Sequence, residues 1–170
     1  MVYAKLVLVV CAAMYCPTPC SASVQTPALS SCSPTHVVAI SAVSITNARV
    51  GRTMVLSYTG RLTTTLNNSP VLNFTMTKKT GGELIPCVGN VGSCQYQLCG
   101  GTNAIEVQIG QPWNNTCPIA PLNYTSGISI PLPFLAGVLI GNGNLHLKIA
   151  AIENRSVVEC QEFDFKIALF

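Results

Sequence analysis

The chain has 170 residues, of which only 9% are charged and 49% are hydrophobic, and its formal net charge is +3. Globular domains usually carry about 25% charged residues. A net charge this small does not predict the basic surface that binds nucleic acid, so we exclude nucleic acid as a partner. The length suits a single domain once a leader sequence is set aside.

Residues 1–22 have the pattern of an export signal. Lys5 supplies a positive start, the segment from Leu6 to Met14 is apolar, and small residues at 20–22 offer a cleavage site. This apolar run is shorter than the roughly 20 residues that span a bilayer, which argues against a membrane anchor as the alternative. We therefore expect a signal peptide over 1–22 and one domain over 23–170, secreted or lysosomal.

Cysteine usage agrees with export. Three of the nine cysteines lie in the expected signal, and an even set of six remains: Cys32, Cys87, Cys94, Cys99, Cys117 and Cys160. Six cysteines in an exported chain predict three disulfides, with fifteen possible connectivities. The only histidines are His36 and His146, too few for a zinc site, so we expect no metal and no cofactor.

Asn-x-Ser/Thr acceptors indicate a glycoprotein, and attached glycans would compensate for the scarce surface charge. The five acceptors are Asn67, Asn73, Asn114, Asn123 and Asn154. Pro70 follows the acceptor serine of Asn67 and makes that site the weakest of the set.

Alternation of apolar and polar residues dominates the sequence after residue 35. Phe163 and Phe165 share one face of the clearest strand, while Glu162 and Asp164 share the other. Such alternation predicts half-buried antiparallel strands, and no segment shows a convincing helical period. Strands are expected at His36–Ile45, Thr53–Tyr58, Leu72–Thr77, Ile105–Ile109, Ile128–Leu132, Leu145–Ile149 and Phe163–Leu169. The predicted fold is all-β, an antiparallel sandwich or cup of about eight strands.

Inward positions of these strands are candidates for lining an apolar lipid cavity. They are Leu56, Tyr58, Leu72, Phe74, Met76, Ile105, Val107, Ile109, Leu132, Leu145, Leu147, Ile149, Phe163 and Phe165. Phe134, in the apolar segment that follows the strand ending at Leu132, is a further candidate. The alternative for each is a place in a filled core, because periodicity does not distinguish a filled core from a lined cavity.

The segment 134–140 is continuously apolar and too short to span a membrane. We interpret it as a membrane-docking loop presenting Leu135, Val138, Leu139 and Ile140, with a buried strand edge as the alternative. Lys78 and Lys79 would suit anionic lipid, although two lysines in a turn are more often simply solvated.

Cys87 and Cys94 enclose six residues that include Gly89 and Gly92, so a local bridge is sterically favourable, with pairing elsewhere as the alternative. This box belongs to an ordered set of motifs. The set comprises Ile85-Pro86-Cys87, Gly92-Ser93-Cys94, Cys99, Cys117-Pro118, Gly143-Asn144-Leu145, Cys160 and Lys166-Ile167-Ala168. In this order the chain resembles the ganglioside activator family, the lysosomal sphingolipid activators of the broader lipid-recognition superfamily.

The resemblance implies a β-cup around an apolar cavity and the pairs Cys32–Cys160, Cys87–Cys94 and Cys99–Cys117. It implies a protein that extracts a ganglioside-type lipid from a membrane surface and presents it to a soluble glycosidase or transfers it. An enzyme is the main alternative class, but the chain has one aspartate, and no Gly-x-Ser-x-Gly elbow occurs. We therefore expect no catalysis. Two further alternatives are a carrier of sterol or another lipid, and an extracellular interaction sandwich with a filled core.

Overall fold

The computed structural model describes residues 23–33, 35 and 37–169. The expected signal peptide over 1–22, and His36 at the start of the first expected strand, lie outside the described residues. The described chain is mostly β, with 50% strand and 12% helix, in two antiparallel sheets. The predicted all-β antiparallel fold is therefore confirmed.

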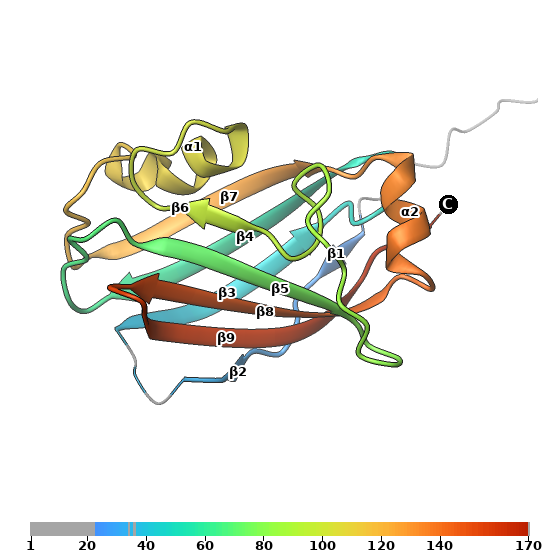
Figure 1. Ribbon diagram of the computed structural model, residues 1–170, viewed down its shortest axis with the longest axis horizontal. Coiled ribbons are helices and arrows are strands. Elements are labelled where there is room, and N and C mark those ends of the chain that lie inside the picture. The colour runs from blue at the N-terminus through green and yellow to red at the C-terminus, as the bar shows by residue number, and fades with distance from the viewer. Residues whose placement is uncertain (1–22, 34, 36, 170) are drawn as a thin grey trace, which may run out of the picture.

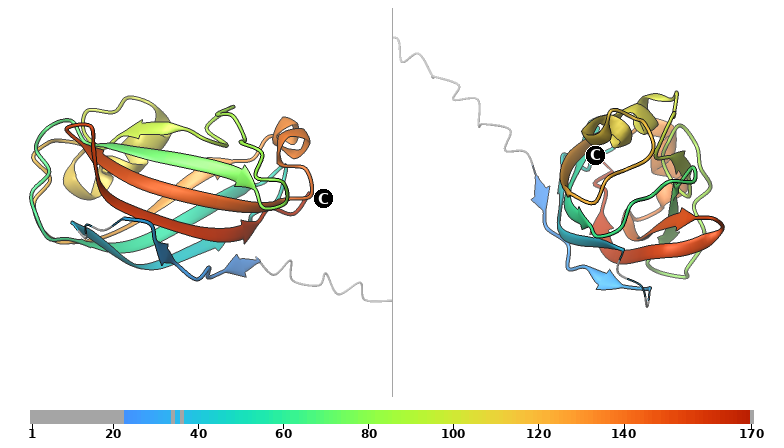
Figure 2. Two further views of the ribbon diagram at one scale, coloured as in Figure 1. Left: turned by 60° about the horizontal axis from the view of Figure 1, so that its bottom comes forward. Right: turned by 90° about the vertical axis from the view of Figure 1, so that its left-hand side faces the viewer.

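Two sheets face each other across the interior (Figures 1 and 2). The first sheet has the order β1-β3-β4-β7, formed by Val24–Gln25, Val38–Thr46, Thr53–Leu62 and Asn123–Pro131. The second sheet has the order β2-β9-β8-β5-β6, formed by Ser30–Ser31, Ser156–Lys166, Asn144–Glu153, Val71–Lys78 and Gln95–Gln97. Strand β7, which ends at Pro131, lies at the edge of its sheet, where a proline that cannot donate a ladder hydrogen bond is tolerated.

The register of the paired strands places large apolar side chains opposite one another on the inner faces of the sheets. Leu147 pairs with Phe163 across β8 and β9, and Leu56 pairs with Ile128 across β4 and β7. All four side chains are less than 5% exposed. Cross-strand pairs of this kind are the stabilising unit of a sheet, and here the same pairs shape the interior.

Within the described residues, three helical segments correct the expectation that no segment is helical. They are α1 (Ala104–Gly110), the 3-10 helix η1 (Gln111–Trp113) and α2 (Phe134–Ile140). Figure 1 shows α1 and α2 at opposite ends of the sandwich. The strand predicted at Ile105–Ile109 is wrong, since these residues lie in α1, and the docking loop predicted at 134–140 is also a helix.

Helix α1 begins with a capping box. The side chain of Asn103 accepts hydrogen bonds from the N–H groups of Ile105 and Glu106, and the Glu106 carboxylate accepts one from the N–H of Asn103. These reciprocal bonds satisfy N–H groups that a helix start leaves without partners. They give the helix an advantage over the strand that the alternation favoured.

Disulfides fasten the ends and loops of the sandwich. Cys32 pairs with Cys160 across 128 residues, Cys87 with Cys94 across 7, and Cys99 with Cys117 across 18. The three pairs are those that the resemblance implies. The first ties the segment before β3 to β9, where the N–H of Cys32 also donates to the carbonyl of Cys160 at 3.0 Å.

Candidate functional site

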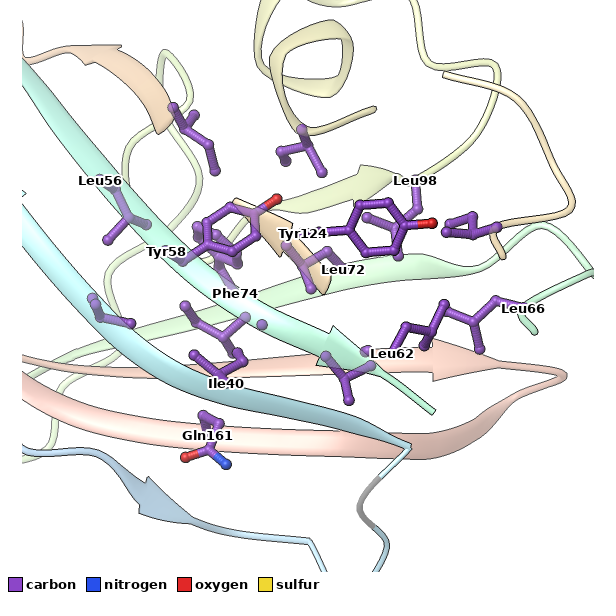
Figure 3. A pocket seen from close by; sticks show the side chains of 18 of the residues that line it. Ile40, Leu56, Tyr58, Leu62, Leu66, Leu72, Phe74, Leu98, Tyr124 and Gln161 are labelled. Atoms are coloured by element: carbon purple, nitrogen blue, oxygen red, sulfur yellow. The ribbon is translucent and has the colours of Figure 1, made fainter. Parts of the chain in front are cut away.

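An apolar cavity of about 110 Å³, measured as the space open to the centre of a water-sized sphere, lies between the two sheets. Side chains from both sheets, from α1 and η1, and from the connecting loops line it (Figure 3). On β4 the lining residues are Leu56, Tyr58, Gly60 and Leu62, which alternate along the strand. The alternation of β4 thus continues four residues beyond the predicted strand and builds one wall.

The polar groups in this lining are bonded to the protein. The hydroxyl of Tyr124 donates to the carbonyl of Ala120 at 2.7 Å. Burial raises the pKa of Tyr58, and a hydrogen bond with the side chain of Ser126 partly opposes that rise. The carboxamide of Gln161 points away from the labelled apolar side chains in Figure 3 and donates to the Glu159 carboxylate at 3.0 Å. The space itself is therefore apolar.

A second cavity of about 20 Å³ continues the interior. It shares Leu56 and Phe74 with the larger one, and both are buried between the sheets. Met54 and Met76 also line it, each 5% exposed. Methionine side chains are flexible and adapt to irregular spaces, so this part of the interior is the most easily reshaped.

The structure brings most of the predicted lining residues together. Leu56, Tyr58, Leu72, Phe74, Ile109, Ile149 and Phe163 line the larger cavity. Met76, Leu147 and Phe165 line the smaller one. Ile105, Leu132 and Leu145 are buried in the core outside both linings.

Two predicted lining residues face outward instead. Val107 is 48% exposed, because the helical turn of α1 directs it away from Ile105 and Ile109. Phe134 is 72% exposed on the first turn of α2. Both errors follow from reading a helix as extended chain, since a helix and a strand send side chains to different faces.

Other lining residues were not among the candidates. Trp113 enters from η1 and Tyr124 from the start of β7, and their rings meet edge to face with centroids 5.4 Å apart. The alternation of Tyr124 with Ile128 and Ile130 could have identified the first part of β7. No periodic signal could have placed Trp113, because the 3-10 turn that positions it follows α1 directly.

Backbone contacts hold the loops that border the cavity. Leu66 and Ile119, both lining residues, form an antiparallel bridge, with N–H to carbonyl distances of 3.1 and 2.9 Å. The Glu153 carboxylate at the end of β8 accepts hydrogen bonds from the N–H groups of Asn67 and Asn68 at 2.6 and 2.9 Å. The loop that carries Leu66 is thus attached to the segment before β7 and to the end of β8.

A carboxylate also anchors the wall formed by α1. Burial alone would raise the pKa of Glu106, but hydrogen bonds from the backbone N–H groups of Gln97, Asn103 and Thr102 lower it below its ordinary value of 4.5. The same carboxylate therefore connects β6 with the start of the helix that brings Ile109 to the cavity.

Helix α2 is divided into an exposed and a buried side. Leu135 and Val138 are 61% and 76% exposed, and with Phe134 they form what we call the α2 patch. Leu139 is half-buried, and Ile140 is fully buried, which corrects its predicted place in a docking surface. The helical turn explains this difference, because it sends Ile140 to the face that packs on the sandwich.

Charged side chains gather on the outer face of the second sheet. Asp164 contacts Nζ of Lys79 at 2.7 Å and Nδ1 of His146 at 2.9 Å, and hydrogen bonds from these two groups, in that order, lower its pKa. Lys78 pairs with Glu83 at 2.7 Å. Both lysines considered for lipid contact are therefore engaged in ion pairs.

The glycosylation acceptors occupy varied positions. Asn67 is exposed in the loop before β5, Asn114 is exposed at the end of η1, and Asn123 is exposed at the start of β7. Asn154 is exposed in the turn between β8 and β9, and Asn73 is half-buried within β5.

Within the described residues no group of three or more His, Cys, Asp or Glu side chains could hold a metal ion. Across the same residues, none of the helices has the length and apolar character needed to cross a membrane. Comparison with known proteins finds no matching family model and no matching protein of curated function.

Proposed function

We propose that the protein binds a lipid in the larger cavity and carries it without chemical change. The observation behind this proposal is an apolar space of about 110 Å³ whose bordering polar groups are bonded to the protein. Protein interiors are close-packed, with few voids larger than a water molecule. An apolar void of this size suits a hydrocarbon ligand, because such voids stay dry and take up apolar molecules.

The volume bears on the length of chain that fits. A water needs roughly 10–15 Å³ on this scale, so the cavity has room for about seven to eleven groups of that size. This is about half of a sixteen-carbon tail. The smaller cavity extends the same interior past Met54 and Met76. We propose that the end of the tail enters there as these methionines change rotamer.

Energetics favour a glycolipid over a free hydrocarbon. Burying a sixteen-carbon tail is worth about 13 kcal/mol at ~0.8 kcal/mol per methylene, but a bilayer already provides this. Contacts with the headgroup must therefore tip the balance. The ordered cysteine, proline and glycine motifs resemble the ganglioside activators, which supports a ganglioside-type sphingolipid as the ligand and its presentation to a hydrolase, or its transfer, as the outcome.

The α2 patch supports transient contact with a membrane surface. Phe134, Leu135 and Val138 expose large apolar side chains on adjoining helical positions, and full burial of such a side chain is worth about 1.5–3 kcal/mol. Three disulfides indicate an oxidising compartment, and we propose secretion or delivery to the lysosome.

A cavity-filling variant tests the proposal. Ala151 lines the larger cavity from β8, so Ala151→Phe places a ring in the space. Ala39→Phe makes the same change at an exposed position of β3 and is the matched control. We expect the first variant to lower transfer of a fluorescent glycolipid between liposomes at least tenfold and the control to transfer normally.

Lipid mass spectrometry on protein purified without detergent completes the test. Co-purified glycosphingolipid in the control and its loss in Ala151→Phe would support the proposal. Co-purified sterol would identify the alternative carrier. Absence of lipid, together with equal transfer by both variants, would refute lipid binding in this cavity.

A further inference from the structure

A shallow, open depression of about 590 Å³, here called the cleft, lies on the outer surface of the sandwich beside the edge strand β7, and polar and apolar groups both line it. It is lined by Ser57, Gln111, Pro112, Thr125, Ser126 and Gly127. None of these described lining residues is charged. Hydroxyl and carboxamide groups can donate and accept hydrogen bonds, which is the chemistry that an uncharged sugar matches. The hydroxyl of Thr125 contacts that of Thr59 at 3.2 Å and the hydroxyl of Ser126 donates to the carbonyl of Gln108 at 3.4 Å, so these two oxygens offer a sugar mainly acceptor capacity.

A glycine keeps the floor of the cleft open. Gly127 pairs with Ser57 across β4 and β7, and a Cβ atom added to it would lie 3.4 Å from Oγ of Ser57. A glycine inside a strand weakens it and often marks a place where another group approaches closely. The sequence therefore leaves space here at some cost to the strand.

An acceptor for N-glycosylation lies on the same face of the same strand. Asn123, Thr125 and Gly127 alternate along β7, and all three are exposed. A strand rises about 3.3 Å per residue, so Asn123 is about 7 Å from Thr125, a lining residue. A glycan attached to Asn123 would begin at the edge of the cleft.

The surrounding surface has little charge. Strands β3 and β7 contain no charged residue, and β4 contains only Arg61. The lining holds no arginine or lysine that could bind a phosphate or carboxylate group through charge-assisted hydrogen bonds. The chemistry of the cleft thus favours an uncharged occupant.

We propose that Asn123 is N-glycosylated and that the first N-acetylglucosamine units of its glycan lie in this cleft. They would pack on Pro112 and Gly127 and exchange hydrogen bonds with Thr125 and Gln111. Attachment raises the effective concentration of the sugar to the millimolar range, so weak contacts suffice. The glycan then covers the charge-poor outer face of the first sheet and stabilises the fold. This role is independent of lipid binding.

Protein secreted from glycosylating eukaryotic cells allows a direct test. Mass spectrometry of glycopeptides measures occupancy at Asn123, and thermal unfolding is compared between the parent protein, Asn123→Gln and Asn154→Gln. Asn154 lies in the β8–β9 turn and serves as the control. We expect Asn123→Gln to lower Tm by about 2–4 °C. The control should leave Tm within about 1 °C, the effect expected of a surface change.

Gly127→Val fills the cleft without altering the acceptor sequence. Valine suits a strand, and its Cβ would make ordinary contacts with Ser57 and Val55, so the unglycosylated protein should tolerate it. In this background Asn123→Gln should no longer lower Tm. Four results would overturn the proposal. The first two are an Asn123 that carries no glycan, and an Asn154→Gln variant whose Tm falls as much as that of Asn123→Gln. The other two are an equal fall of Tm on Asn123→Gln in the Gly127→Val background, and a Gly127→Val protein that transfers less glycolipid both with and without the glycan.

Discussion

Replacing Glu106 by glutamine tests how the helical wall of the cavity is held. The Glu106 carboxylate accepts backbone hydrogen bonds from Gln97 at 2.9 Å, Thr102 at 3.0 Å and Asn103 at 3.2 Å. Hydrogen bonds to a charged group contribute about 1.5–3 kcal/mol each when well shielded, and less at a partly exposed site such as this. Glutamine keeps one oxygen acceptor and loses the charge. We expect Glu106→Gln to lower the free energy of unfolding by about 1–2 kcal/mol.

Thermal unfolding measures this loss, and its pH dependence identifies the charge as the cause. Because the folded-state pKa of Glu106 lies below the ordinary value of 4.5, its contribution is complete above that value and disappears as the pH falls through the folded-state pKa. At pH 7 the variant should melt about 2–8 °C below the parent protein. The two should converge once the carboxyl is protonated in both the folded and the unfolded state.

Glu83→Gln is the matched control. Glu83 is an exposed partner of Lys78, so its replacement should change the free energy of unfolding by less than about 1 kcal/mol. Two results would show that the Glu106 carboxylate does not stabilise the α1 wall of the cavity. One is a Tm of Glu106→Gln at pH 7 equal to that of Glu83→Gln. The other is a Tm difference between Glu106→Gln and the parent protein that stays the same in acid.

Three further predictions concern the frame and the surface. Gly143 has a φ of 76°, and an added Cβ would lie on the carbonyl oxygen of Ile167, so Gly143→Ala should cost at least about 1–3 kcal/mol in denaturant unfolding. Replacing Cys32 and Cys160 together by alanine should cost up to about 4–5 kcal/mol, because a loop of over a hundred residues is released; equal midpoints would contradict this. Val138→Ser on the α2 patch should weaken binding to liposomes at least threefold with an unchanged Tm, and unchanged binding would exclude the patch from docking.

Alternation predicted the central strands because each buries one face and hydrates the other. In β8 and β9 the partners Leu147 and Phe163 are buried, while His146 and Asp164 lie on the opposite face. Burial of one strand face produces the alternation in the sequence, and the same burial fixes the register of the strands in the structure. For this reason the fold class and much of the cavity lining could be predicted.

The segment 105–109 shows where alternation fails. Ile105 and Ile109 share a face at a spacing of four residues, which fits both a strand and a helix. Only Val107 distinguishes them, and it is exposed. The deciding signal was the capping pair of Asn103 and Glu106, which the sequence shows but periodicity ignores. In α2 no polar residue interrupts the apolar run, so no period could be measured there.

Helix α1 performs two tasks that a strand at the same place would not combine. Its inner side brings Ile109 to the cavity, and its outer residue Gln108 accepts a hydrogen bond from the N–H of Ser129 at 2.7 Å. Ser129 lies on β7, whose free edge would otherwise offer backbone groups to another chain. The capped helix α1 therefore both closes one side of the cavity and covers part of the β7 edge. Because Glu106 supports that start, weakening it should loosen the cavity wall and expose the β7 edge in one step.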